Sequence, residues 1–299
     1  MIKNKYVFTA ILLAVILLAG LGLTSLYVKQ QDEAGEDGTL TVVTSFYPMY
    51  VAAENIIGDC EGVSLENLSE PQTGCLHDYQ LTTEDMRLLA TADVFIINGG
   101  GIESFLSEVA EQYPDLVVID ACEEAELLDD NAHAWMSIGR YMTQTETICA
   151  GLINADPEAA HEEIYRENAD RYLGDLQALR DEYADVLGGL GGQPVVLFHE
   201  AYEYLADDLG LEVVGIMDLD EERQVSAGEV ADILSVIAEE EVPVIFAEEL
   251  YGKDMGDTVE AEADVNVIYL DTLTRGDYDA DSYLDGMRAN LELIREAYQ

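Results

Sequence analysis

The sequence predicts an α/β protein with two lobes, each built on a mainly parallel sheet, joined by one long rigid α-helix. Two observations predict this fold class. Short apolar, β-branched segments alternate with amphipathic helical segments in both halves of the chain, and this alternation is typical of parallel sheets covered by helices. Between the halves, residues 156–187 carry one continuous helical pattern. A chain of 299 residues is long enough for two such lobes.

The N-terminal segment, residues 1–28, is predicted to be a membrane anchor or a signal segment. Two lysines precede an apolar run without a charged residue, from Tyr6 to about Tyr27. Such a run has about the 20 residues that span a bilayer, and basic residues before it place the N-terminus in the cytoplasm. We expect an uncleaved helix that tethers the protein to the outer face of the cytoplasmic membrane, whereas cleavage would release a secreted protein. An acidic linker follows at residues 29–38.

The first lobe is expected over residues 39–155. Its strand segments are residues 40–46, 62–68, 93–99 and 115–120. Its first three helical segments are residues 50–57, 82–92 and 101–113. The segment at 82–92 opens with threonines and acidic residues, which favour a helix start. The glycine run at 99–101 lacks the lysine and the spacing of a phosphate-binding loop, so we interpret it as a tight turn.

The helix that joins the lobes is expected over residues 156–190. A proline lies just inside its start and glycines follow its end, as is typical of helix boundaries. Apolar residues recur at every third or fourth position along it. At about 1.5 Å per residue the helix would be roughly 45 Å long. Because such a helix is too long for an ordinary element of a small domain, we interpret it as a rigid connection between the lobes.

The second lobe is expected over residues 191–299. Its strand segments are residues 194–199, 211–216, 242–249 and 266–271. Its helical segments are residues 200–210, 226–241, 255–265 and 279–299. A two-lobed α/β protein binds its ligand between the lobes, at the carboxyl ends of the strands.

The charge of the chain excludes one class of partner. With 62 acidic and 13 basic residues, the formal net charge is -49. Such a surface repels phosphate backbones, so the protein is not expected to bind nucleic acid, and it attracts cations. Four cysteines fit an oxidising exterior, where disulfides persist. Cys60 and Cys75 are the favoured pair among three possible pairings.

Histidine is scarce, and three of the four histidines follow predicted strands. His77 and His133 lie in loops after strands of the first lobe, and His199 ends a strand of the second. Asp271 ends the last strand. Because the carboxyl ends of parallel strands meet at one edge of a sheet, these four side chains are expected to converge between the lobes. His161 lies near the start of the long helical segment and is interpreted as a surface residue.

Three imidazoles and one carboxylate form a set of ligands suited to Zn²⁺, with distances of about 2.0–2.2 Å to the ion. The carboxylate keeps Mn²⁺ as the alternative. Ligation requires neutral imidazole, so affinity should fall in acid. Four protein ligands leave no position for a reactive water, and the protein is therefore not expected to be an enzyme. The alternative is a zinc-dependent hydrolase in which three histidines hold the ion and Glu200 or Glu248 acts as the base.

Four further residues are expected to surround the ligands. Glu248 and Glu200 lie near strand ends of the second lobe, and Glu248 is expected to orient an imidazole or polarise the site. Trp135 and Tyr79 follow two of the histidines by two residues. Their side chains either form a dry wall around the ion or serve ordinary packing.

Several segments together resemble the metal-binding substrate-binding proteins of zinc and manganese ABC importers. They are "TGCLHDYQLTTEDMRLLATADVFIINGGGIESFL", "NAHAWMS", "VVLFHEAYEYLA", "IFAEELYG" and "VIYLDTL". The resemblance extends from about Leu40 to the end of the chain. It implies two α/β lobes joined by a long helix, and it places the four metal ligands at His77, His133, His199 and Asp271.

The resemblance also implies a function. The protein would capture Zn²⁺, with Mn²⁺ as the alternative, and deliver it as a monomer to an ABC transporter permease. Histidine at the third ligand position favours zinc. The chain departs from the family at Leu76 and Ala132, where proline is usual before the ligand, and it lacks the cysteine that carries a lipid in many members. A metal-binding cell-adhesion module is a further alternative.

Overall fold

The computed structural model describes residues 39–69, 76–77, 79–129, 131–219 and 225–299. The predicted anchor and linker, residues 1–38, lie outside this part of the chain. No helix within the described residues combines the length and the apolar character needed to cross a membrane. Cys60, Cys122 and Cys149 carry free, buried thiols, and Cys75, the favoured partner of Cys60, lies outside the described residues.

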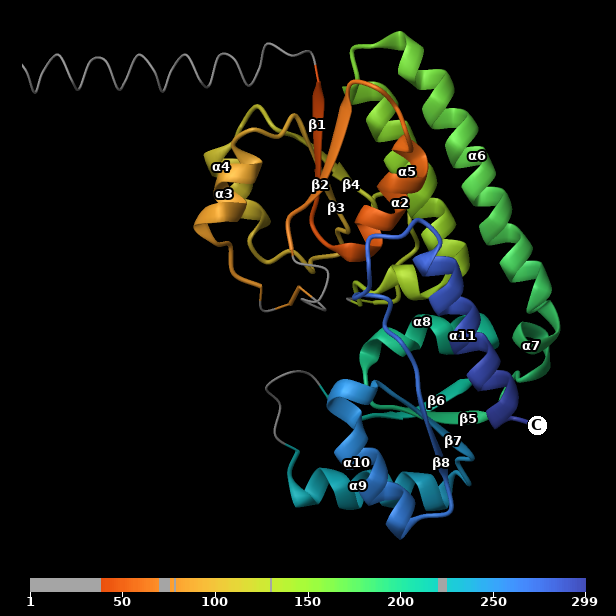
Figure 1. Ribbon diagram of the computed structural model, residues 1–299. Coiled ribbons are helices and arrows are strands. Elements are labelled where there is room, and N and C mark those ends of the chain that lie inside the picture. The colour runs from red at the N-terminus through yellow and green to blue at the C-terminus, as the bar shows by residue number, and fades with distance from the viewer. Residues whose placement is uncertain (1–38, 70–75, 78, 130, 220–224) are drawn as a thin grey trace, which may run out of the picture. The chain divides into compact units, whose positions relative to one another are not determined.

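The first lobe has a four-stranded parallel sheet with the strand order β2-β1-β3-β4 (Figure 1). Its strands are β1 (Leu40–Thr44), β2 (Val63–Asn67), β3 (Val94–Ile97) and β4 (Val117–Asp120). Its helices are α2 (Tyr47–Ile57), α3 (Thr83–Leu89), α4 (Leu106–Gln112) and α5 (Ile138–Ala155). The helices α2 and α5 pack against one side of the sheet, and α3 and α4 lie on the other. The central strand β3 is buried along its whole length, which explains its uninterrupted apolar sequence.

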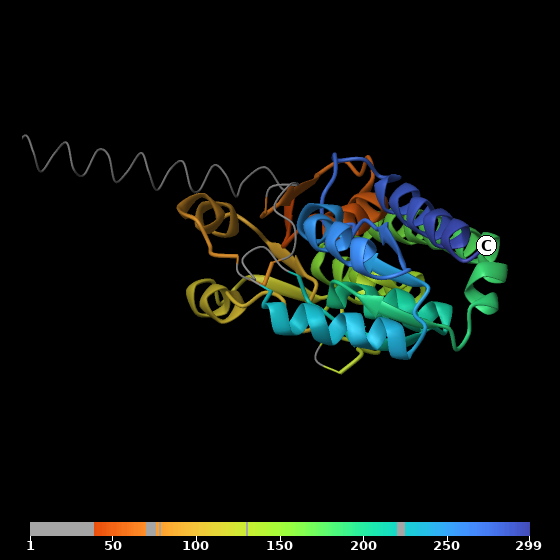
Figure 2. The ribbon, with the colours of Figure 1, turned by 90° about the horizontal axis from the view of Figure 1, so that it is seen from below.

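The second lobe repeats this topology with the strand order β6-β5-β7-β8. Its strands are β5 (Pro194–Leu197), β6 (Glu212–Ile216), β7 (Val244–Ala247) and β8 (Asn266–Tyr269). Its helices are α8 (Glu203–Leu209), α9 (Ala227–Glu239) and α10 (Glu249–Glu262). Figure 2 shows α9 and α10 in front, and the two helices contact each other. The predicted fold class, two lobes with parallel sheets, is therefore confirmed.

Two helices begin at capping boxes, in which the cap side chain and the third helical residue bond each other's backbone N–H groups. Thr82 and Asp85 form one at the start of α3, and Ser226 and Glu229 form the other at the start of α9. Each pattern satisfies two backbone donors that the helix itself leaves unpaired. These starts agree with the sequence signals.

The long helical pattern forms two helices, α6 (Ala159–Glu182) and α7 (Ala184–Gly189), rather than one. The 24 residues of α6 extend over about 36 Å at 1.5 Å per residue. At Tyr183 the backbone leaves the helical region, with φ −105° and ψ 13°. At this break the Tyr183 ring is buried and packs under the Arg295 guanidinium of α11 (Ser282–Ala297), 4.5 Å from the ring centre.

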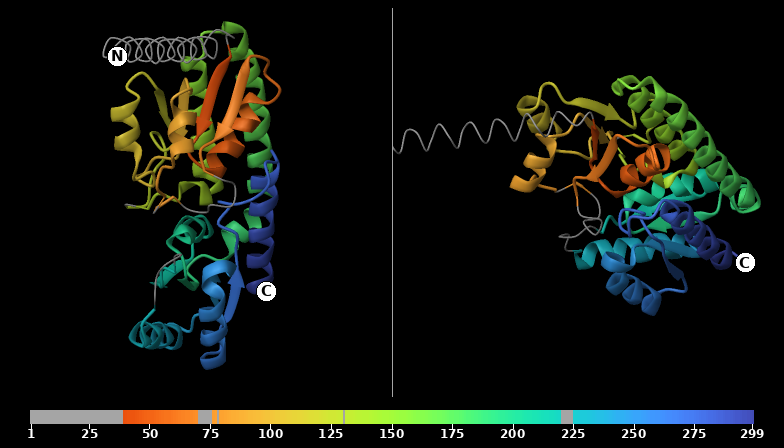
Figure 3. Two further views of the ribbon diagram at one scale, coloured as in Figure 1. Left: turned by 60° about the vertical axis from the view of Figure 1, so that its left-hand side comes forward. Right: turned by 45° about the horizontal axis from the view of Figure 1, so that its top comes forward.

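The C-terminal helix α11 belongs to both lobes, although the sequence assigns it to the second. It contacts β8 of the second lobe, α2 of the first lobe, and α6. Figure 3 shows it running beside α6. Its buried face includes Tyr283, Met287 and Leu291. The connection between the lobes is therefore a pair of helices.

Helix α10 starts earlier than predicted, at Glu249 instead of residue 255. Its sequence contains Gly252 and Gly256, which disfavour a helix. Both glycines have a packing reason. A side chain at Gly252 would lie 3.0 Å from the Ala247 Cβ, and one at Gly256 would lie 2.5 Å from the Tyr269 hydroxyl. The helix approaches its sheet closely only because these residues lack a Cβ.

The lobes are bonded to each other by buried side chains, and residues Thr41–Gln299 form a single unit. The Tyr204 hydroxyl of the second lobe donates a hydrogen bond to the Asn131 carbonyl of the first, at 2.6 Å. The rings of Tyr141 and Tyr283 stack with their centres 3.7 Å apart. The Tyr283 hydroxyl also donates to the Trp135 carbonyl, at 2.7 Å.

Candidate metal centre

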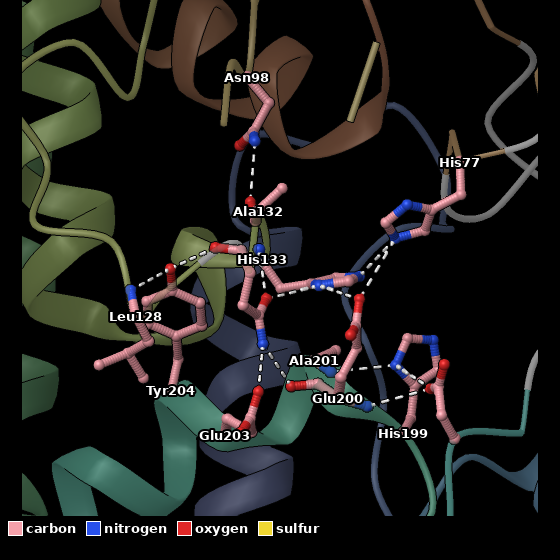
Figure 4. A network of polar contacts seen from close by, with 12 residues as sticks. His77, Asn98, Leu128, Ala132, His133, His199, Glu200, Ala201, Glu203 and Tyr204 are labelled. Carbon is pink, nitrogen blue, oxygen red and sulfur yellow. Dashed lines mark hydrogen bonds and ion pairs between the residues drawn. The ribbon is translucent and has the colours of Figure 1, made fainter. Parts of the chain in front are cut away.

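His77 lies between β2 and α3, in the turn that the sequence predicts. Its side chain is 44% exposed, and its Nε2 atom lies 3.3 Å from Nε2 of His133. The two ring centres are 5.1 Å apart. The structure therefore brings together two of the predicted ligands, and their Nε2 atoms face the same point (Figure 4).

His133 follows β4 and immediately precedes a short 3-10 helix, η1 (Ala134–Met136). Its imidazole is fully buried. Nδ1 lies 2.8 Å from Oδ1 of Asn131, which also accepts a hydrogen bond from the His133 backbone N–H at 2.9 Å. Since an amide oxygen only accepts, Nδ1 carries the proton and Nε2 presents its lone pair toward Nε2 of His77. Burial, with smaller contributions from His199 and His77, lowers the pKa of His133 well below its ordinary value.

Asn131 fixes the orientation of His133 and was missed by the sequence analysis. Its Nδ2 group donates to the Glu200 carbonyl at 2.9 Å and to the Glu203 carboxylate at 2.7 Å. These two acceptors lie in the second lobe, so the amide cannot turn over without losing both bonds. The one available signal was its position two residues before a histidine in a loop. A ligand held in one tautomer by a neighbouring group is typical of metal sites.

Hydrogen bonds from buried side chains of the first lobe also hold the loop that carries His133. The Asn98 side chain, at the end of β3, donates to the Ala132 carbonyl at 2.9 Å (Figure 4). Gln144 in α5 in turn donates to Oδ1 of Asn98 at 2.8 Å. All three of these residues are buried. The loop that carries His133 is therefore held by the first lobe as well as by the second.

Glu200 stands at the start of a 3-10 helix, η2 (Glu200–Tyr202), directly after His199. Its Oε1 atom lies 3.8 Å from Nε2 of His77 and 3.7 Å from Nδ1 of His133. Among the described residues, one group of metal-binding side chains has its ligand atoms within 4.8 Å of one another, and it consists of His77, His133 and Glu200. The sequence analysis gave Glu200 only a supporting role.

His199 follows β5 and lies beside this group, with its ring centre 5.3 Å from that of His133. Its Nδ1 atom accepts a hydrogen bond from the Ala201 N–H at 3.0 Å. Asp218, which follows β6, has its carboxylate 4.0 Å from the same atom and accepts from the Glu200 N–H at 3.3 Å. Asp218 does not stand out in the sequence, because acidic residues are common everywhere in this chain.

Asp271 lies after β8, where the sequence places it, but outside the group around His77. Its Oδ1 atom accepts a hydrogen bond from the Leu273 N–H at 2.7 Å. Leu273 has a φ of +58°, a conformation that β-carbons disfavour, and its side chain is buried. Asn290 of α11 bonds both the N–H and the carbonyl of Asp271, at 2.8 and 2.7 Å. The role of Asp271 as a ligand remains an expectation.

The remaining candidates have different surroundings. Glu248 is buried and forms an ion pair with Arg275 at 2.7 Å, so its expected contact with an imidazole remains a prediction. Trp135 is fully buried, and its ring centre lies 5.0 Å from that of His133. The Tyr79 hydroxyl donates to Asp85 at 2.9 Å, and its ring packs against Phe105. Of the two aromatic residues, Trp135 is therefore the one that lies beside a predicted ligand.

His161 lies near the start of α6 and does not belong to this group. It is nevertheless not a simple surface residue. Its Nδ1 atom lies 2.8 Å from the Asp156 carboxylate, and its side chain is only 15% exposed. The Tyr165 hydroxyl donates to the same carboxylate at 2.5 Å. This cluster joins the end of α5 to the start of α6.

The geometry of the group suits a divalent cation. Two atoms that each lie about 2.1 Å from one ion at a near-tetrahedral angle are about 3.4 Å apart, and the two Nε2 atoms are 3.3 Å apart. Imidazole nitrogen suits zinc and other transition ions, and carboxylate oxygen suits manganese. Two α/β lobes with parallel sheets and such side chains at the strand ends are typical of a metal-binding solute-binding protein.

The family model for the zinc-uptake complex component A, periplasmic (ZnuA), matches residues 42–297, and the chain belongs to this family. The resemblance inferred from the sequence is therefore confirmed. Because the family consists of solute-binding proteins, the protein is not an enzyme, and the hydrolase alternative is excluded.

The relatives of this chain do not all bind the same metal. The chain is 28% identical to the manganese-binding lipoprotein MntA of Halalkalibacterium halodurans, over 97% of each chain. It resembles the SBP FpvC of Pseudomonas aeruginosa in complex with Mn²⁺, with a TM-score of 0.78 and 28% identity over 87% of this chain and 98% of that one. It also resembles the Zn(II)-bound ZnuA-like domain of Streptococcus pneumoniae AdcA, with a TM-score of 0.75 and 26% identity over 87% and 99%. Binding of a divalent metal ion is what these relatives share.

Proposed function

We propose that the protein captures Zn²⁺, with Mn²⁺ as the alternative, outside the cytoplasmic membrane and delivers it to the permease of an ABC importer. The convergence of the His77 and His133 Nε2 atoms at 3.3 Å is the observation that carries this proposal. Both imidazoles come from the first lobe, and the Glu200 carboxylate of the second lobe lies against them. The family and the metal-binding relatives support the same function.

We propose His77, His133, His199 and Asp271 as the ligands of the ion, two from each lobe. In support, the three imidazoles lie next to one another and each follows a strand. Asp271 would complete the set by a movement of its loop or of the second lobe. The hydrogen bonds between the lobes and the helix α6 should restrict closure to small displacements. Release to the permease would then proceed through loop motion or slight tilting of the lobes.

We propose that residues 1–28 tether the protein to the outer face of the cytoplasmic membrane. Their apolar composition supports a spanning helix. The relative MntA is a lipoprotein, but this chain has no cysteine in its first 59 residues to carry a lipid. An anchor of this kind would keep the metal-binding lobes near the permease.

The direct test is elemental analysis of the purified protein, followed by competitive titration with Zn²⁺ and Mn²⁺. The histidines offer a matched pair of variants. His77→Ala removes a side chain that is 44% exposed, so the fold should remain intact. We expect its metal affinity to fall by more than about 100-fold, because changes next to the ligands alone cost about 10–100-fold. His161→Ala should bind like the wild type, and equal affinities of the two variants would refute the proposal.

Two aspartates offer a second matched pair of variants. Asp271→Ala should weaken metal binding sharply if this residue closes the site. Asp257 is an exposed carboxylate on α10, paired with Lys253, and Asp257→Ala should leave binding unchanged. Full affinity in Asp271→Ala would remove Asp271 from the ligand set but leave the function standing.

A further inference from the structure

The carboxylate of Glu200, the residue after His199, lies in a position that its proposed supporting role does not explain. The Oε1 atom of Glu200 lies within 4 Å of two imidazoles of the other lobe, at 3.8 Å from His77 and 3.7 Å from His133. The backbone fixes this placement at both ends. The Glu200 N–H donates to Asp218 at 3.3 Å, and its carbonyl accepts from Asn131 at 2.9 Å. The start of η2 therefore aims the carboxylate at the site (Figure 4).

A simple ion pair with His133 does not account for this arrangement. Nδ1 of His133 is already committed to Asn131, at the shorter distance of 2.8 Å. The Nε2 atoms of His77 and His133 are 3.3 Å apart, so one of them must present a lone pair to the other. A cation between them satisfies both lone pairs and the carboxylate at once. The distance from Oε1 to Nε2 of His77, 3.8 Å, exceeds the separation of two ligand atoms on one ion, about 3.4 Å, by only a few tenths of an ångström.

We propose that Glu200 is itself a ligand of the transported ion and shifts the preference of the site from Zn²⁺ toward Mn²⁺. This inference rests on the proposed function. Three imidazoles and Asp271 alone would suit four-coordinate zinc. A second carboxylate adds an oxygen donor and raises the coordination number, and both favour Mn²⁺, which prefers oxygen ligands and a higher coordination number. His199 and Glu200, adjacent in the chain, thereby supply one nitrogen and one oxygen donor from the second lobe.

The test compares Glu200→Gln with the wild type in parallel titrations with Mn²⁺ and Zn²⁺. The Glu200 side chain is 37% exposed, so the substitution should not impair folding. We expect Mn²⁺ affinity to fall by about tenfold or more, and Zn²⁺ affinity to fall less. Glu249→Gln, which alters an exposed carboxylate at the start of α10, serves as the control and should change neither affinity.

Spectroscopy separates a ligand from a residue that acts only through its neighbours. In Co²⁺-loaded protein, loss of the Glu200 oxygen should lower the coordination number and intensify the visible absorption bands, whereas Glu200→Asp should restore much of the wild-type spectrum. Unchanged Mn²⁺ affinity and an unchanged Co²⁺ spectrum in Glu200→Gln would overturn the role of Glu200 alone. Failure of the wild type to bind either ion would overturn the proposed function with it.

Discussion

The indole N–H of Trp135 donates a 2.9 Å hydrogen bond to the backbone carbonyl of Thr272, so the segment that carries His133 is bonded to the loop that carries Asp271. Both residues are buried. The Trp135 ring also packs edge-on against Phe46 and lies beside the His133 ring. One side chain thus lines the metal site and ties together two loops from different lobes.

Replacing Trp135 with phenylalanine should weaken both the fold and the site. The ring is largely kept, but the Thr272 carbonyl is left without its partner in a buried place, at a cost of about 1–3 kcal/mol in the free energy of unfolding. Metal affinity should fall as well, because the Asp271 loop loses its bond to the first lobe. Urea denaturation and metal titration measure the two effects.

Tyr113→Phe is the matched control for this variant. It also removes one hydrogen bond from an aromatic side chain to a backbone carbonyl, that of Met86, at 2.5 Å. It lies among the helices α3 and α4, away from the histidines. We expect a loss of stability without a loss of metal affinity. If Trp135→Phe behaved in the same way, the bond to Thr272 would be structural only.

Asn131→Ala should lower metal affinity by about 10–100-fold, the usual effect of removing a group that orients a ligand. Without the amide oxygen, the His133 imidazole is free to change tautomer, and Nε2 no longer presents its lone pair reliably. Isothermal titration with Zn²⁺ measures the change. Asn168→Ala is a suitable comparison, because Asn168 bonds the Ile56 carbonyl at 3.0 Å on the far side of the first lobe. An affinity loss of equal size in both variants would contradict a specific role for Asn131.

The turn after β3 offers a test of backbone geometry. Gly99 and Gly101 both have positive φ, +82° and +91°. A Cβ at Gly99 would lie 1.8 Å from an Asp120 carboxylate oxygen, whereas a Cβ at Gly101 meets no atom within 4 Å. Gly101→Ala should therefore cost about 1–2 kcal/mol for the left-handed conformation alone. Gly99→Ala should cost clearly more, and thermal unfolding of the two variants compares them. Equal losses would show that Asp120 moves aside freely.

The sequence could predict that the three histidines lie close together, because their positions depend on simple rules. His77, His133 and His199 each follow a strand, and the carboxyl ends of parallel strands share one edge of a sheet. The fold class followed in the same way from alternating segments. Both inferences use only the order of elements along the chain, and hydrophobic patterns reveal that order.

Other features depend on contacts that no local pattern records. The bonds of Asn131 to Glu200 and Glu203 exist only once the lobes have docked. The position of the Glu200 carboxylate likewise depends on how η2 faces the other lobe. The break at Tyr183 packs against α11, which comes about 100 residues later in the chain. The early start of α10 could be predicted only if Gly252 and Gly256 were recognised as the points where the helix contacts its sheet.

The buried carboxyl of Glu103 should make stability depend on pH in the first lobe. Burial raises its pKa from 4.5 to about 7, although the N–H groups of Asn98 and Gly99 and the Ser45 hydroxyl all donate to it. The folded protein then holds this proton up to about pH 7, whereas the unfolded chain releases it near pH 4.5. Its contribution is complete below pH 4.5 and is lost as the pH rises to about 7. The total loss is on the order of 3 kcal/mol.

Glu103→Gln removes this titration, so the free energy of unfolding should fall less steeply between pH 5 and about pH 7 in the variant than in the wild type. The slope is the informative quantity, because the amide also changes the hydrogen bonds and shifts stability at every pH. Glu108→Gln, at an exposed position in α4, controls for the loss of one negative charge from a chain with a net charge of -49. Urea denaturation at several pH values gives the slopes. Parallel curves for the wild type and Glu103→Gln would mean that the three donors keep Glu103 ionised in spite of its burial.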